Sequence, residues 1–75
     1  MKSYAEFLRG FVGKRGNLHS PREAWPYYYF LFIIKKPTSD SGDAKLIDVG
    51  IDYAEFAVGN RIRIVPLNLL ILDVE

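Results

Sequence analysis

The chain has 75 residues, with ten lysines and arginines against nine aspartates and glutamates, one histidine and no cysteine. A chain of this length folds as one domain with a small core, and the lack of cysteine excludes disulfide bonds as support for it. The net charge of +1 argues neither for nor against a polyanionic partner. We therefore expect a single domain over residues 1–75 that gains support from self-association.

No stretch of the sequence resembles a membrane span. The longest apolar run, residues 27–34, is far shorter than the roughly 20 residues that a span needs. The first ten residues mix charged and apolar side chains, which is unlike a secretory signal. These features predict a soluble cytoplasmic protein without a membrane partner.

A short helix is predicted over residues 3–10. Ser3 and Glu6 have the spacing of a capping box, and Gly10 offers a left-handed stop. The apolar residues recur at helical spacing: Tyr4, Phe7, Leu8 and Phe11.

Two strands with an intervening loop follow the helix. The first strand, residues 12–18, is expected to bend at Gly13 and Gly16. Residues 27–36 are dense in aromatic and β-branched side chains, which predicts a long strand covered on both faces. The Pro, Ser, Gly and Asp residues of the next segment, residues 37–43, predict a turn.

The second half of the chain predicts three more strands. Residues 44–58 read as one half-exposed strand that bends at Gly50, with Ile47, Val49, Ile51 and Tyr53 on its apolar face. A tight turn at residues 59–60 precedes a strand over 61–65, which ends because proline cannot donate to a ladder. The last strand, residues 69–74, is almost wholly aliphatic and must be hidden against the core or against another copy.

This order of elements predicts a mainly β fold. We expect a short N-terminal helix followed by a five-stranded, strongly bent antiparallel barrel of the Sm-like or SH3-like kind. An OB-fold is disfavoured because it usually places a helix between its third and fourth strands, where this chain has only a tight turn.

Catalytic and metal-binding patterns are weak. His19 stands beside Ser20 without a third partner or a nucleophile elbow. The carboxylates lack the spacing of a calcium loop: Asp40, Asp43, Asp48 and Asp52. We therefore expect a non-catalytic protein with no metal and no cofactor.

Two constellations are compatible with nucleic-acid binding. The aromatic run of residues 25–32 ends near Lys35 and Lys36, so it could stack bases beside cations or form core and subunit interface. Arg61 and Arg63 share a strand face near Asn68 and could contact phosphates and bases. The alternative is that both arginines pair with surface carboxylates: Asp48, Asp52 or Asp73.

After the capped helix, Leu8, Phe11, Val12, Gly13 and Lys14 resemble the opening of the first strand in the Sm/LSm (Hfq-like) family. The resemblance implies a homo-oligomeric ring in which residues 61–65 of one subunit pair with residues 69–74 of the next. The implied subunit interface contains Ile62, Ile64, Leu69 and Ile71. The resemblance implies that nucleic acid binds around the pore through two loops, which here are residues 36–43 and 65–68. With the strand cations named above, the predicted nucleic-acid-binding residues are Lys35, Lys36, Thr38, Ser39, Arg61, Arg63 and Asn68.

The sequence therefore predicts a ring-forming protein that binds single-stranded RNA or DNA and acts in RNA or DNA processing or metabolism. The alternative is an SH3-like protein-interaction module, in which Trp25 and the tyrosines at positions 27–29 line a peptide groove.

Overall fold

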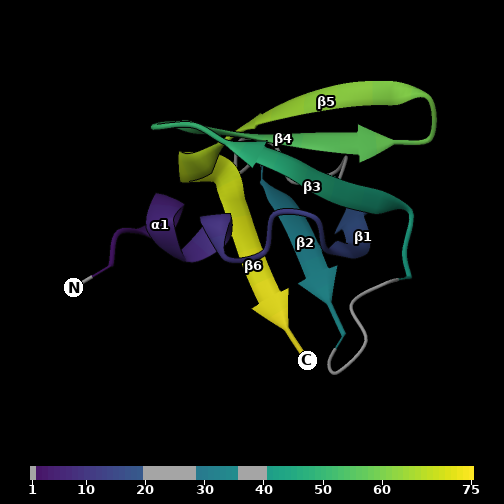
Figure 1. Ribbon diagram of the computed structural model, residues 1–75, viewed down its shortest axis with the longest axis horizontal. Helices are drawn as coiled ribbons and strands as arrows, with labels where there is room; N and C mark the ends of the chain where they lie inside the picture. The colour runs from purple at the N-terminus through teal and green to yellow at the C-terminus, as the bar shows by residue number, and fades with distance from the viewer. Residues whose placement is uncertain (1, 20–28, 36–40) are drawn as a thin grey trace.

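A computed structural model describes residues 2–19, 29–35 and 41–75 (Figure 1). These residues are mainly β, with one short helix near the N-terminus, which confirms the fold class at this level. The elements are α1 (Tyr4–Arg9), β1 (Arg15–His19), β2 (Phe30–Ile34), β3 (Ala44–Val49), β4 (Tyr53–Val58), β5 (Arg61–Pro66), the 3-10 turn η1 (Leu67–Leu69) and β6 (Leu70–Val74).

The capping box predicted for α1 is present. The Ser3 side chain accepts a hydrogen bond from the Glu6 backbone N–H at 3.2 Å, and the Glu6 carboxylate accepts one from the Ser3 N–H at 3.5 Å. Gly10 ends the helix with φ at −66°, so the predicted left-handed stop is wrong. Leu8 is fully buried and anchors α1 to the core.

The strands form one open sheet in the order β5-β4-β3-β1-β2-β6. All neighbouring strands are antiparallel except β2 and β6, which run parallel. Among the described residues, the two end strands β5 and β6 do not pair with each other, so the predicted closed five-stranded barrel is not observed. In Figure 1, β3, β4 and β5 run across the ends of β2 and β6.

Residues 44–58 form two strands instead of the predicted single bent strand. A bulge between Leu46 and Asp48 shifts the register, so Leu46 and Val49 are both buried. The chain then reverses, and the Gly50 N–H donates a hydrogen bond of 2.9 Å to the Tyr53 carbonyl oxygen. Ile51 lies in this turn with 89% of its surface exposed, so the predicted apolar face that included it is wrong.

The first two strands are shorter than predicted. β1 begins at Arg15 because residues 11–13 form a turn, in which Gly13 has φ at 93°. The Val12-Gly13-Lys14 segment that carried the Sm/LSm resemblance therefore lies before the first strand. β2 covers Phe30–Ile34, and residues 27, 28 and 36 of the prediction fall outside the described residues.

The core lies between α1 and strands from both ends of the sheet. Phe32 of β2 and Phe56 of β4 are fully buried and meet edge to face, with ring centroids 4.7 Å apart. The other buried residues are Leu8, Ile34, Ala44, Leu46, Val49, Ala54, Val65 and Leu70. No helix in the described part of the chain is long and apolar enough to cross a membrane.

Candidate nucleic-acid interface on strand β5

Strand β5 joins β4 through a two-residue turn, residues 59–60, where Gly59 has φ at 62°. Glycine suits this turn because other residues rarely adopt a positive φ. In the β4–β5 register, Arg61 lies opposite Val58 and Arg63 opposite Phe56. Because Phe56 is buried, the two arginines lie on the core-side face of the sheet, at its outer margin.

The opposite face of β5 carries Ile62 and Ile64. These side chains keep 58% and 55% of their surface exposed, although aliphatic side chains are usually buried. Arg61 and Arg63 are also exposed, and within β5 only Val65 is buried. β5 therefore combines an arginine face, an isoleucine face and an end position in the sheet.

The two arginines are free cations within the described residues. Neither guanidinium forms an ion pair or a hydrogen bond there. Neither arginine pairs with Asp48, Asp52 or Asp73, so the alternative of surface ion pairs with these residues is not observed.

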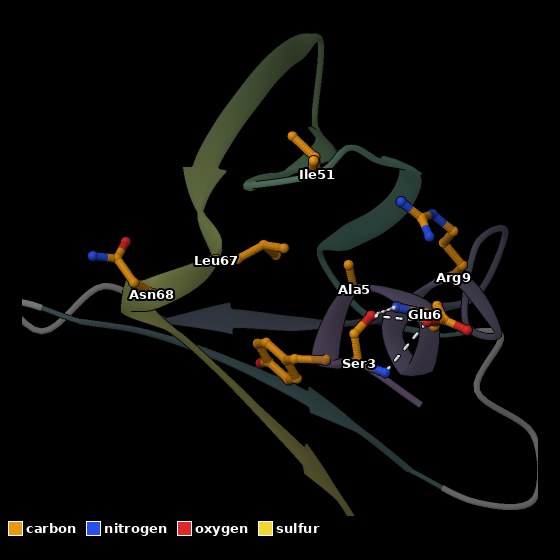
Figure 2. Close-up of a pocket in the computed structure, with 8 residues that line it drawn as sticks. Ser3, Ala5, Glu6, Arg9, Ile51, Leu67 and Asn68 are labelled. Atoms are coloured by element: carbon orange, nitrogen blue, oxygen red, sulfur yellow. Dashed lines mark hydrogen bonds between the residues drawn. The ribbon is translucent and has the colours of Figure 1, made fainter. Parts of the chain in front are cut away.

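The structure does not bring Asn68 together with both arginines. Asn68 lies in η1, beyond the end of β5 that is remote from Arg61. The five residue steps from Arg61 to Pro66 span roughly 17 Å of extended strand. Asn68 is exposed, and Figure 2 shows its amide projecting away from Leu67 and Ala5.

Of the remaining predicted binding residues, the structure describes Lys35, which does not join this surface. Lys35 is exposed at the end of β2, which three strands separate from β5 in the sheet order. Lys36, Thr38 and Ser39 fall outside the described residues.

The aromatic run is largely structural where the structure describes it. Phe32 is buried in the core, and Phe30 and Leu31 are half-buried, whereas Tyr29 is 36% exposed. Phe32 is thus part of the core and Phe30 packs against it, which favours a core role over a base-stacking platform for these two rings. Trp25, Tyr27 and Tyr28 fall outside the described residues.

Strand β6, the other predicted half of the subunit interface, is partly covered by α1. The Tyr4 hydroxyl donates a hydrogen bond of 2.6 Å to the Leu70 carbonyl oxygen. Burial raises the pKa of the Tyr4 phenol above its ordinary value of 10.0, and a backbone hydrogen bond from Leu72 acts in the opposite direction. Backbone groups of residues 70 and 72 point to the same side of a strand, so Tyr4 occupies one edge of β6.

In Figure 1, α1 lies on the side of β6 opposite to β2, which identifies that edge as the outer one. The predicted interface residues in and just before β6 are Ile71, which is 49% exposed, and Leu69, which is half-buried.

Sequence patterns missed an open groove of about 570 Å³ between α1, the β3–β4 turn and η1. Figure 2 shows Leu67 pointing toward Ala5, with Ile51 above them. The Arg9 guanidinium closes one side, donating to the carbonyl oxygens of Val49 at 3.3 Å and Gly50 at 3.4 Å. The sequence signal that could have indicated the groove is an isoleucine that stands between glycine and aspartate, two residues typical of turns.

The residues described contain no cluster suited to a metal ion.

The chain matches no family model, no curated protein and no solved structure in comparisons with known proteins.

Proposed function

We propose that this protein is a non-catalytic nucleic-acid-binding protein that contacts the phosphates of single-stranded RNA or DNA through Arg61 and Arg63. The observation that carries the proposal is the pair of exposed guanidinium groups on one face of β5, which form no ion pair within the part of the chain that the structure describes. Guanidinium groups bind phosphate oxygens with charge-assisted, often bidentate hydrogen bonds. Such a protein fits a role in RNA or DNA processing or metabolism.

The spacing of the two arginines suits neighbouring phosphates of one strand. Residues two apart on the same strand face are separated by roughly 7 Å along the backbone. Contacts of this kind depend on charge and carry no base information, so binding is expected to be insensitive to sequence. Two phosphate contacts give only modest affinity, and repetition of the pair in an assembly raises it.

Self-association is the second part of the proposal. The exposed Ile62 and Ile64 on an end strand support it, because such an edge is prone to pair with another chain. The ring predicted from the sequence joins residues 61–65 to residues 69–74 of the next copy. Apart from Leu69, which lies in η1, these residues belong to the two end strands of the sheet. The Tyr4 contact makes β6 the less accessible edge, and the ring stays a prediction.

The proposal is tested by titrating labelled single-stranded oligothymidylate and oligoadenylate over a range of salt concentrations. Binding of both sequences with similar affinity, and a steep loss of affinity as salt is added, is the expected result. No binding at low salt, or binding that salt does not weaken, would refute it.

A peptide-binding module is the second candidate, and the groove beside Ile51 is the observation that favours it. This exposed isoleucine above Leu67 offers an apolar contact for an extended segment of another protein. Binding to such a peptide would depend on Ile51 and would change little with salt. If an Ile51→Asp variant binds oligonucleotides as tightly as the parent protein does, nucleic acid binds outside the groove.

A further inference from the structure

We propose that two copies of this chain pair through their β5 edges around a two-fold axis at Arg63. The pairing joins both arginine pairs into one anion-binding surface. The pairing of edges stands on the geometry of β5, while the role of the joined arginines rests on the proposed function.

The backbone groups of β5 divide between β4 and the open edge. A two-residue hairpin turn makes Val58 and Arg61 a hydrogen-bonded pair, and the pattern then alternates along an antiparallel ladder. Arg61, Arg63 and Val65 therefore direct their N–H and C=O groups toward β4. The Leu67 N–H, which donates to the Asp52 carbonyl oxygen at 3.0 Å, continues the same alternation. The backbone groups of Ile62 and Ile64 consequently point to the open edge.

The open edge is short, because Pro66 follows these two residues and has no N–H to donate. An antiparallel copy fits this length. With Ile62 opposite Ile64 of the partner copy, each such pair exchanges two backbone hydrogen bonds. The backbone N–H and C=O groups of Ile62 and Ile64, four in each copy, then all have hydrogen-bond partners. Shifting the register by two residues brings Pro66 or Asn60 opposite an isoleucine and leaves edge groups unpaired.

The same register gathers four isoleucine side chains on one face. Cross-strand neighbours in an antiparallel pair have Cβ atoms about 5 Å apart, which brings Ile62 and the partner copy's Ile64 into contact. More than half of each side chain is exposed in the single copy and becomes available for burial.

On the other face, Arg63 meets Arg63 of the partner copy, and the two Arg61 residues flank them. Like charges directly opposite each other destabilise strand pairing. The contact between two six-residue edges also buries less than the roughly 1,000 Å² typical of stable complexes. The protein alone should therefore form only a weak dimer, strengthened by salt, which screens the arginines, or by a polyanion, which bridges them.

A bridging polyanion couples binding to dimerisation. A ligand that binds the dimer more tightly than the monomer shifts the equilibrium toward the dimer, and the dimer in turn binds that ligand more tightly. Each copy supplies half of the anion-binding surface, so that surface is incomplete in the monomer.

The first test uses sedimentation equilibrium of the protein alone, from micromolar to millimolar concentration, at low and high salt. The expected result is a monomer–dimer equilibrium with more dimer at high salt. Ile64→Pro should abolish the dimer, because it removes an N–H that points to the open edge and leaves the β4 ladder intact. A monomer at all concentrations, a ring larger than a dimer, or an Ile64→Pro variant that still dimerises would overturn the edge pairing.

A second variant keeps the test valid if Ile64→Pro fails to fold. The double variant Ile62→Thr/Ile64→Thr keeps β-branched side chains and all backbone N–H groups but removes apolar contacts, so it should weaken the dimer severalfold. Circular dichroism confirms that either variant is folded. Unchanged dimerisation of the folded double variant would also overturn the pairing.

The second test adds a single-stranded oligothymidylate long enough to span two copies at low salt. It should raise the dimer fraction of the parent protein but not of Ile64→Pro. If the protein dimerises alone but binds no oligothymidylate, the proposed function fails and the edge pairing stands. If the parent and Ile64→Pro bind it equally well as monomers, the proposed function stands and the joined arginine surface is refuted.

Discussion

The Tyr4 hydroxyl donates a hydrogen bond of 2.6 Å to the Leu70 carbonyl oxygen and thereby fastens α1 to β6. The contact covers part of one end of the sheet and leaves β5 as its open end. The exposed arginines and isoleucines on β5 therefore stand on the edge that remains accessible.

Replacing Tyr4 by Phe should destabilise the fold, because the Leu70 carbonyl oxygen loses its donor while the ring remains. The expected loss is about 1 kcal/mol, which lowers the melting temperature of a domain of this size by roughly 4–8 °C. Thermal unfolding monitored by circular dichroism measures the effect. An unchanged melting temperature would show that this hydrogen bond contributes nothing to stability.

The same residue predicts a pH dependence. Because burial raises the pKa of Tyr4 in the folded state, its contribution to stability is complete below pH 10.0 and is lost as the pH rises through the folded-state pKa. The difference in unfolding free energy between the parent protein and Tyr4→Phe should shrink above that pH. Denaturant titrations of both proteins at neutral and alkaline pH measure it, and a difference that grows with pH contradicts the assignment.

Gly16 should tolerate no side chain. A Cβ at this position would collide with the Ile33 carbonyl oxygen on the neighbouring strand β2, so Gly16→Ala is expected to cost about 1–3 kcal/mol. Gly59→Ala is the matched control, because its Cβ meets open space and the cost of its φ of 62° is offset by the lower entropy of the unfolded chain, so it should cost less than about 1 kcal/mol and less than Gly16→Ala. Equal stabilities of the two variants in urea unfolding would contradict close packing of β1 on β2.

Ile71→Lys separates the two modes of assembly. Because Ile71 is 49% exposed, the variant should change the unfolding free energy by only about 0.5 kcal/mol. Pairing through β5 predicts unchanged dimerisation of this variant, whereas a ring closed through β6 predicts loss of assembly. Sedimentation of the variant beside the parent protein distinguishes the two results.

Local features were predictable from the sequence, and long-range ones were not. The capping box at Ser3 and Glu6 and the turn at residues 59–60 depend on neighbouring residues, and both are present. The parallel pairing of β2 with β6 joins segments far apart in the chain, so no local pattern encodes it. The bulge after Leu46 shifts the register within β3, and Ile51 in the following turn continues the apolar alternation of the sequence, so the hairpin resembled one strand.

The candidate site was predictable only in part. The alternation of arginine and isoleucine over residues 61–64 correctly indicated two distinct faces of β5. The sequence placed Asn68 beside the arginines because it follows closely in the chain, but the extended strand separates them. Among residues 2–19, 29–35 and 41–75, no carboxylate pairs with either arginine, and this depends on the tertiary fold, which sequence spacing does not reveal.

The most direct test of nucleic-acid binding through β5 compares two double variants that remove equal charge. Arg61→Gln/Arg63→Gln and the control Lys14→Gln/Arg15→Gln, whose residues are exposed away from β5, are titrated with single-stranded oligothymidylate at several salt concentrations. The β5 variant should bind more weakly, and its slope of log affinity against log salt should fall by about 1.4 units for two lost phosphate contacts. The control should keep a slope close to that of the parent protein. Equal affinity and slope for the β5 variant and the parent would remove Arg61 and Arg63 from the binding site.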